Sequence, residues 1–357
     1  MQKSSFRFRV ATLVGVSLAV SGLVFSQSLL GPATDTRTLR SGSAAGDRAG
    51  ADMGRPLLGF VARSSPVELR AILGVPGAAV FSDALLTPSD ATTVRIAPGR
   101  PYAGPYAWIE RSGGAPSILA LSGTRAGNAS PLPGALPRAD LVAFSPLGNS
   151  VALFSAASHR LQVIAGLPDA PKITQDLDAA LLPGPPDSLA VSDDASAVLL
   201  ASGRAAYLLS PSGQTRLILN LSASAALAFF PNSAAAAIAD RGAGSVYLMH
   251  NSAGDISSGL LAAGLDGLQD IASTTDAASL VLTNPSANRI WTVSAQTGEV
   301  RSFDSRISAA ALSRIGDGDT FLIASEPGQP AWIFVPEGAD GHTVLVPAAP
   351  PARPRRD

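Results

Sequence analysis

A two-strand pattern that recurs six times after residue 90 constrains the fold of this chain most strongly. In each copy an apolar run ends in a turn of mostly polar or glycine residues, and a second apolar run follows. The turn anchors are spaced by roughly 38 to 48 residues, which is the length of one four-stranded blade of a β-propeller. The anchors are Ala97, Ser145, Ser192, Phe230, Thr274 and Ser313.

Residues 280–300 form the clearest copy and indicate antiparallel strands. Their sequence, LVLTNPSANRIWTVSAQTGEV, places β-branched and aromatic residues between two turns rich in Asn, Pro and Gly. Short runs of this kind between turn residues are typical of hairpins. A third strand is predicted in most copies, at residues 160–164, 206–209, 245–249, 289–293 and 331–335. An outer strand is predicted at residues 215–219 and 299–303.

Three further candidate strands, at residues 57–62, 69–73 and 78–86, decide the number of blades. Packing blades around a closed ring buries both faces of every sheet and protects the edge strands. We therefore predict an all-β fold, a single β-propeller of four-stranded blades, with seven blades favoured over six. With seven blades, residues 343–346 supply the strand that the N-terminal blade lacks. With six, residues 57–86 form an N-terminal extension.

Two segments leave a helical alternative open. Residues 222–240 are rich in alanine, which favours helix, but Pro231 lies in their middle and an uninterrupted helix would not tolerate it. Residues 260–271 have room for one or two helical turns. The repeat period outweighs the alanine propensity, so we expect strands in both places.

Composition excludes several classes of function. The 357 residues have a net charge of −1, which gives no general attraction to nucleic acid or to an anionic membrane surface. Cysteine is absent, which excludes disulfides, thiolate metal sites and a cysteine nucleophile. Hydrophobic residues make up 46% of the chain and charged residues 15%, so the chain is expected to fold around a sizeable core.

The two ends of the chain read as segments outside the propeller. Residues 1–26 have the basic start and the uncharged apolar run of an export signal, with cleavage expected after Ser26. An uncleaved N-terminal anchor is the alternative, and either reading places the rest of the chain in the periplasm or outside the cell. Residues 27–56 are predicted to be a flexible linker, 57–347 the propeller and 348–357 a disordered tail. No later segment is long and apolar enough to span a membrane.

Three runs carry a resemblance to a known type of repeat. Thr283-Asn284, followed by RIWTV at 289–293 and TGEV at 297–300, matches one pattern. LAVSDDASAVLL at 189–200 matches its entry turn, with Asp193 where proline is usual, and AIADRGAGSVYLM at 237–249 is closer to a second pattern. These runs resemble the YVTN and NHL-type β-propeller repeats of bacterial secreted proteins. The resemblance covers about residues 91–338 and implies a fold much more firmly than a function.

The residues that carry chemistry most often do not form a recognisable site. His159, His250 and His342 fall in or beside predicted turns of different blades and have no metal-type spacing. The pairs Asp193-Asp194 and Asp317-Gly318-Asp319 suit hairpin turns better than calcium loops. The glycine pairs do not form a phosphate-binding loop, and a GxSxG element does not occur. We therefore expect no cofactor and no metal.

One loop is the best candidate for recognition of a partner. Arg100, Tyr102, Tyr106 and Trp108 cluster in and after a stretch rich in Pro and Gly. Packing between blades is the more common role of strand aromatics. If an exposed loop binds a partner, we expect it to be this one.

These observations favour an exported, non-catalytic propeller that binds a partner through loops on one face. The expected partner is a protein or a glycan, the expected state is a monomer, and nucleic acid is not expected. The rival is a propeller enzyme, lactonase- or lyase-like, with its site at the central channel. A third reading is a structural module tethered to the membrane by its linker. The sequence candidates for a channel site are Arg95, Asp193, Arg314 and Asp317.

Overall fold

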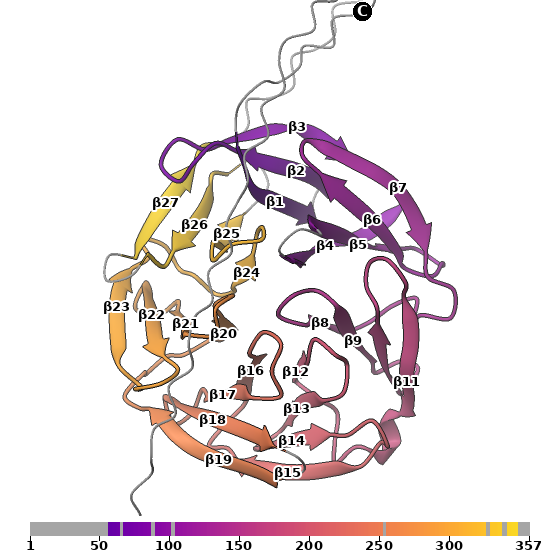
Figure 1. The fold of residues 1–357 in the computed structure, drawn as a ribbon, viewed down its shortest axis with the longest axis vertical. Helices are drawn as coiled ribbons and strands as arrows, with labels where there is room; N and C mark the ends of the chain where they lie inside the picture. The colour runs from indigo at the N-terminus through magenta and orange to yellow at the C-terminus, as the bar shows by residue number, and fades with distance from the viewer. Residues whose placement is uncertain are drawn as a thin grey trace, which may run out of the picture. The chain divides into compact units, whose positions relative to one another are not determined.

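The computed structural model describes residues 56–64, 67–86, 90–100, 104–252, 255–325, 329–337 and 341–348. They form seven antiparallel sheets arranged as blades around a central axis (Figure 1). Within these ranges the one helical element is a 3₁₀ turn, η1 (Ala179–Leu181). The predicted all-β fold and the seven-bladed propeller are confirmed. The predicted signal segment, linker and most of the tail lie outside the described residues.

The strands follow one another from the axis to the rim within each blade. Blade 1 contains β1 (Leu57–Ser64), β2 (Val67–Leu73) and β3 (Val80–Leu86). Blade 2 contains β4 (Ala91–Arg100), β5 (Gly104–Arg111), β6 (Ser117–Ser122) and β7 (Arg125–Pro131). Blade 3 contains β8 (Leu141–Phe144), β9 (Ser150–Ser155), β10 (Arg160–Ala165) and β11 (Lys172–Asp178). Blade 4 contains β12 (Ser188–Val191), β13 (Val198–Ser202), β14 (Ala205–Leu209) and β15 (Thr215–Asn220).

The last three blades repeat the four-stranded plan. Blade 5 contains β16 (Ala225–Phe229), β17 (Ala236–Asp240), β18 (Ser245–Ser252) and β19 (Asp255–Ala262). Blade 6 contains β20 (Asp270–Ser273), β21 (Ser279–Asn284), β22 (Arg289–Ser294) and β23 (Val300–Asp304). Blade 7 contains β24 (Ser313–Arg314), β25 (Phe321–Ser325), β26 (Ala331–Val335) and β27 (His342–Val346).

Blade 1 has three strands, and the one it lacks is the innermost. β1 begins at the turn after β24, where the backbone of Gly59 lies against the carbonyl of Ile315. It ends near the hairpin after β25, where the Arg63 guanidinium donates to Gln329 O at 3.1 Å. β1 therefore runs in the same direction as β25, the second strand of blade 7, and opposite to β24, its first strand. This makes β1 a second strand, so the first strand of blade 1 is the missing one.

The C-terminal strand does not complete blade 1. The prediction that residues 343–346 supply the missing strand is wrong, because β27 pairs with β26 along its whole length. A short loop joins these two strands, so β27 forms the rim of its own blade. Only four residues connect Leu86 to Ala91, which leaves no room for a further strand between blades 1 and 2.

A backbone hydrogen bond closes the same turn after the innermost strand in five blades. The N–H of the first turn residue donates to the carbonyl five residues later, at 2.9 to 3.1 Å. These first residues, called turn residues below, are Ser145, Ser192, Phe230, Thr274 and Ile315. The predicted anchor Ser313 is wrong by two residues, since it lies inside β24. The other four predicted anchors of blades 3 to 6 are these turn residues.

The hydrophobic core lies between neighbouring blades. Between blades 4 and 5, for example, Leu199 and Leu208 pack with Leu227, Ile238 and Met249 in one buried cluster. The alanine-rich segment forms β16 and β17, whose ten residues are all buried, so the helical alternative is wrong there. Residues 263–269 form a connection without helix between β19 and β20. Small alanines let the sheets approach each other closely.

Polar contacts between turns tie the blades together at one face of the ring, called the turn face below. Asp193 accepts from Leu147 N of blade 3 and from Asn232 N of blade 5, both at 2.8 Å. Asp319 of blade 7 accepts from Thr275 N and Oγ1 of blade 6 at 2.7 and 3.0 Å. Side chains of the turns thus act as clamps that fix the blades around the channel.

Candidate functional site

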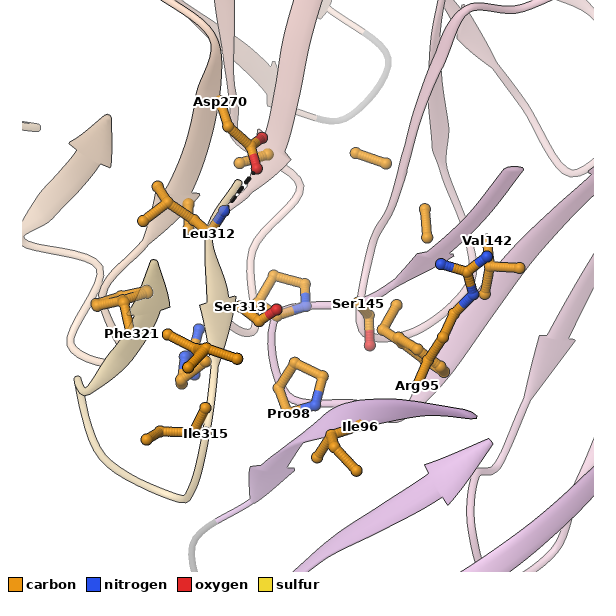
Figure 2. Close-up of a pocket in the computed structure, with 18 of the residues that line it drawn as sticks. Arg95, Ile96, Pro98, Val142, Ser145, Asp270, Leu312, Ser313, Ile315 and Phe321 are labelled. Carbon is orange, nitrogen blue, oxygen red and sulfur yellow. Dashed lines mark hydrogen bonds between the residues drawn. The ribbon is translucent and has the colours of Figure 1, made fainter. Parts of the chain in front are cut away.

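The innermost strands surround a cavity of about 560 Å³ on the axis of the ring. Every blade contributes to its lining, β1 in blade 1 and the first strand in the other six. Most lining residues are apolar, and Figure 2 shows Arg95 and Val142 on one side of the cavity and Asp270, Leu312 and Phe321 on the other. Its volume lies in the range of roughly 300 to 1,000 Å³ that is usual for small-molecule sites.

The repeat shows what each lining position needs for packing. The residue before the turn residue is Phe144 in blade 3, Val191 in blade 4, Phe229 in blade 5 and Ser273 in blade 6. In blade 7 the same position holds Arg314. The fold therefore accepts an apolar or small residue here, and the arginine is a departure that packing does not require.

Arg95 is a second departure from the repeat. The position two residues before the turn residue holds a small side chain in blades 3 to 7: Ala143, Ala190, Ala228, Ala272 and Ser313. In blade 3 Val142 and Phe144 pack toward the preceding blade, and Ala143 lies between them. In blade 2 Val94 and Ile96 pack toward the preceding blade in the same way. Arg95, which lies between them, therefore occupies the position that holds a small residue in blades 3 to 7. Both departures lie in the blades that flank the incomplete blade 1.

Arg314 is buried without an ion-pair partner. Its residue is 7% exposed, and Nη2 donates to Ser273 O at 3.1 Å. Its Nε and Nη1 are buried and have no hydrogen-bond partner. Burial lowers the pKa of the guanidinium, and the Asp319 and Asp193 carboxylates oppose this from a distance. No described acidic group lies within 4.0 Å of it in an ion pair.

Arg95 has an acidic neighbour and is less isolated. It is half-buried, it pairs across the strands with Trp108, and its Nε has no hydrogen-bond partner. Glu110 on β5 is 6% exposed, and burial raises its pKa. The charge of Arg95 opposes that shift, although no hydrogen bond or ion pair joins the two groups among the described residues. Of the two channel arginines, Arg314 has the larger unmet demand for an anion.

Asp270 is a channel residue that the sequence reasoning missed. Its Oδ2 accepts from Leu312 N at 2.8 Å (Figure 2), and its Oδ1 accepts from its neighbour Ile271 N at 2.9 Å. Burial raises its pKa, against the effect of these two bonds and of Arg241. Oδ2 joins β20 to the residue before β24, and Oδ1 is occupied by a bond within β20, so the group has a structural role. In the sequence, Asp270 follows the loop of residues 263–269 and looks like an ordinary aspartate at the end of a loop.

The four sequence candidates for a channel site separate in the structure. Arg95 and Arg314 line the channel, as described. Asp193, at 8% exposure, clamps three blades through its two backbone bonds. Asp317 is exposed in the turn between β24 and β25. The four residues therefore do not form one catalytic cluster.

The candidate recognition loop is mostly interior. Tyr106 and Trp108 lie on β5, each 1% exposed, and both pack edge-on against Phe144 of blade 3. The prediction that they lie on an exposed loop is wrong. Side chains alternate between the two faces of β5, and Tyr106 and Trp108 both point to the face that packs against blade 3. Arg100 ends β4 and forms an exposed ion pair with Asp169 at 3.0 Å. Tyr102 lies outside the described residues, and binding by this segment stays a prediction.

The histidines stay apart. His159, His250 and His342 are all exposed, in blades 3, 5 and 7. No group of three or more potential metal ligands exists among the described residues. The described part of the chain also lacks a helix with the length and apolarity needed to cross a membrane.

Comparison with known proteins shows the fold alone. No family model and no curated protein sequence matches the chain. A protein of unknown function from Desulfotomaculum acetoxidans superposes with a TM-score of 0.56 at 11% identity, covering 82% of this chain and 100% of that one. A putative 6-phosphogluconolactonase from Bacteroides fragilis gives 0.54 at 14%, covering 84% and 96%. A catalytically inactive virginiamycin B lyase from Staphylococcus aureus, with quinupristin, gives 0.50 at 13%, covering 72% and 86%.

Proposed function

We propose that this protein is a non-catalytic binding module that takes a small ligand into its central channel. The observation that carries the proposal is the channel lining. Most of its residues are apolar but the surface they expose to the cavity is as polar as it is apolar, its volume suits a small molecule, and its charged side chains are Arg95, Arg314 and the structurally engaged Asp270. Such a lining provides shape and a few polar contacts, which is what a binding site needs.

A fluorescent probe tests channel binding directly. N-phenyl-1-naphthylamine is neutral and apolar, so it reports on the channel without relying on charge. Ser313 is exposed and lines the channel, so Ser313→Trp is expected to fill the cavity and abolish the fluorescence gain. The matched control is Ser302→Trp on the rim strand β23, where the serine is also exposed. Equal probe binding by both variants would show that the channel is not the site.

The enzyme alternative has weaker support. Two neighbours of similar fold are a putative 6-phosphogluconolactonase and a virginiamycin B lyase, but at 14% and 13% identity they support a propeller and not a reaction. Catalysis by acid and base needs a titratable group that can reach substrate. Asp270 has both oxygens committed to backbone N–H groups. Lactone hydrolysis or lyase turnover by the purified protein, lost in Arg314→Met, would reverse this ranking.

The same proposal includes export and a YVTN- or NHL-type repeat. Asn284 supports the repeat, because its Oδ1 accepts from Ala287 N and its Nδ2 donates to Asp266 O at the hairpin after β21. Asp240 has the same place in blade 5 and accepts from Ser222 N and Gly242 N. Sequencing the N-terminus of the protein from the envelope fraction tests export. The expected first residue is Gln27, and a cytoplasmic protein that starts at Met1 would contradict it.

A protein or glycan partner at the turn face remains a proposal alongside the channel ligand. Such a partner would bind through the loops of the turn face, as expected from the sequence. Capture of a partner by wild-type protein and equally by Ser313→Trp would place that contact outside the channel.

A further inference from the structure

The buried guanidinium of Arg314 is costly for the fold. An arginine offers five N–H donors, and three of them, on Nε and Nη1, have no partner here. A buried donor without an acceptor loses its hydration and receives nothing in return. Four other blades fill the same position with Phe, Val or Ser. The fold could therefore avoid this cost, which indicates that the arginine serves something other than packing.

The surrounding carboxylates do not meet this demand. The Asp193 oxygens accept from Leu147 N and Asn232 N, and the Asp319 oxygens accept from Thr275 N and Oγ1. All four carboxylate oxygens therefore accept hydrogen bonds from residues of the turns and not from Arg314. Both groups act on Arg314 only through their charge. Within the described residues Nη2 has a close acceptor, Ser273 O, and Nε and Nη1 have none. Arg314 lines the channel, so a channel ligand can supply the missing acceptor once the side chain rotates to expose these buried nitrogens.

We propose that Arg314 binds the anionic group of an amphipathic ligand, a carboxylate on an apolar body, inside the central channel. This inference rests on the proposed function and names the ligand class of the same site. The guanidinium rotates about its side-chain torsions to form a forked pair with the two carboxylate oxygens. The apolar body lies along Val142, Leu189, Leu227, Ile271 and Leu312, which come from five different blades.

The local charge favours a single negative charge on the ligand. Asp193 and Asp319 lie near enough to influence Arg314, so they repel a dianion more than a monoanion. Arg95 interacts with Glu110 and offers less to a second anionic group. A carboxylate therefore suits the site better than a phosphate monoester, which carries up to two charges near neutral pH.

Three probes with one apolar chain separate charge from shape. Decanoate, decyl phosphate and decan-1-ol are titrated into the full-length protein by calorimetry. We expect decanoate to bind most tightly, decyl phosphate more weakly and decan-1-ol weakest. In Arg314→Met decanoate affinity should fall by about 10- to 100-fold, while the affinity for decan-1-ol stays within about twofold. Arg314→Lys should recover part of the loss, because the charge remains and the fork is absent.

Two controls separate binding from folding. Arg289→Met removes an exposed arginine on β22, away from the channel, and should leave all three affinities unchanged. Without ligand, Arg314→Met should keep or raise Tm, because the variant removes a buried charge that has no ion-pair partner. A merely structural Arg314, holding Ser273 O, predicts a lower Tm and unchanged decanoate affinity. That result would overturn the inference.

The outcomes also distinguish this inference from the proposed function. If N-phenyl-1-naphthylamine binds in the channel but decanoate binds no better than decan-1-ol, the channel site stands and the carboxylate inference is wrong. If decanoate binds and Arg314→Met does not weaken it, the anion is held elsewhere and the inference is again wrong. If neither decanoate nor the neutral probe binds, both proposals fail.

Discussion

Blades 3 to 6 and blades 7, 1 and 2 belong to one ring but are joined in different ways. In blades 3 to 6, called the arc, every sheet has four strands and turn side chains clamp the neighbours, as Asp193 does. In blades 7, 1 and 2, called the seam, the inner strand of blade 1 is missing. Blades 2 and 7 then meet directly, where Gly99 N donates to Gly316 O at 3.1 Å.

The difference shows where the chain departs from what the repeat needs. The arc keeps apolar or small residues at the two lining positions, and the seam carries Arg314 and Arg95 there. The seam also brings backbones into contact, which only glycine permits at Gly59 and Gly316. Local rules broken without a packing gain are expected at functional sites. Variants in the seam therefore test function, and matched variants in the arc show what the same kind of change does to stability alone.

The largest expected effect is at Gly59, where the seam closes. A Cβ at this position would overlap the carbonyl oxygen of Ile315, a backbone atom that cannot move aside alone. Gly59→Ala should lower the free energy of unfolding by about 3 kcal/mol or more, measured in urea. The matched control is Gly114→Ala, because a Cβ there would meet nothing within 4 Å. Equal stability of the two variants would mean that the seam is not closed by this contact.

Asp193 is the corresponding test of the arc. Asp193→Ala leaves the N–H groups of Leu147 and Asn232 without their acceptor, and we expect a loss of about 2 kcal/mol. Asp317→Ala, an exposed aspartate of the seam, should change stability by less than about 0.5 kcal/mol. Urea unfolding of the two variants measures both. If Asp193→Ala were as stable as its control, the arc would be held by apolar packing alone.

Much of the fold was predictable, because a period of fixed length survives variation of single residues. The repeat predicted the first strand of blades 2 to 7, the third strand of blades 3 to 7, the rim strands β15 and β23, and the turn residues Ser145, Ser192, Phe230 and Thr274. The direction of β1 was not predictable, since an apolar hairpin has the same pattern whether it provides strands 1 and 2 or strands 2 and 3. Ser313 was mistaken for an anchor because Ile315, the true turn residue, is followed by glycine and aspartate without Ser or Pro.

The site was predictable only in part, for a different reason. Arg95 and Arg314 were identified because charged residues are rare in the entry strands. Their isolation was not predictable, because it depends on which neighbours meet at the axis. Tyr106 and Trp108 were placed on a loop because Pro and Gly precede them, but the strand resumes at Gly104 and buries both. Asp270 was missed because its partner, Leu312 N, lies 42 residues away.

Tyr106 tests the boundary between seam and arc with a smaller effect. Its hydroxyl donates to Gly148 O at 2.9 Å in a buried contact that joins blade 2 to blade 3. Tyr106→Phe should lower the free energy of unfolding by about 1 kcal/mol, because the carbonyl loses its donor while packing stays the same. Tyr207→Phe in the arc is the control, since its hydroxyl has no hydrogen bond to any residue that the structure describes, and no loss is expected. A larger loss in the control would contradict the assigned contact.

The smallest effect concerns Glu110, which lies beside Arg95 in the seam. Burial raises the pKa of its carboxyl, Arg95 and Arg138 oppose the shift, and Asp140 adds to it. A carboxyl with a raised pKa contributes most to stability below its unfolded value of about 4.3, and this contribution is lost as the pH rises through its folded value. Glu110→Gln should therefore raise Tm slightly at pH 7 to 8, and the gain should vanish as the pH falls toward about 4. Thermal unfolding across this range decides the sign. A lower Tm at pH 7 to 8 that recovers on acidification would show instead that Glu110 is held as a stabilised anion by Arg95. The two channel arginines would then differ more sharply, since Arg314 forms no ion pair with a described acidic group.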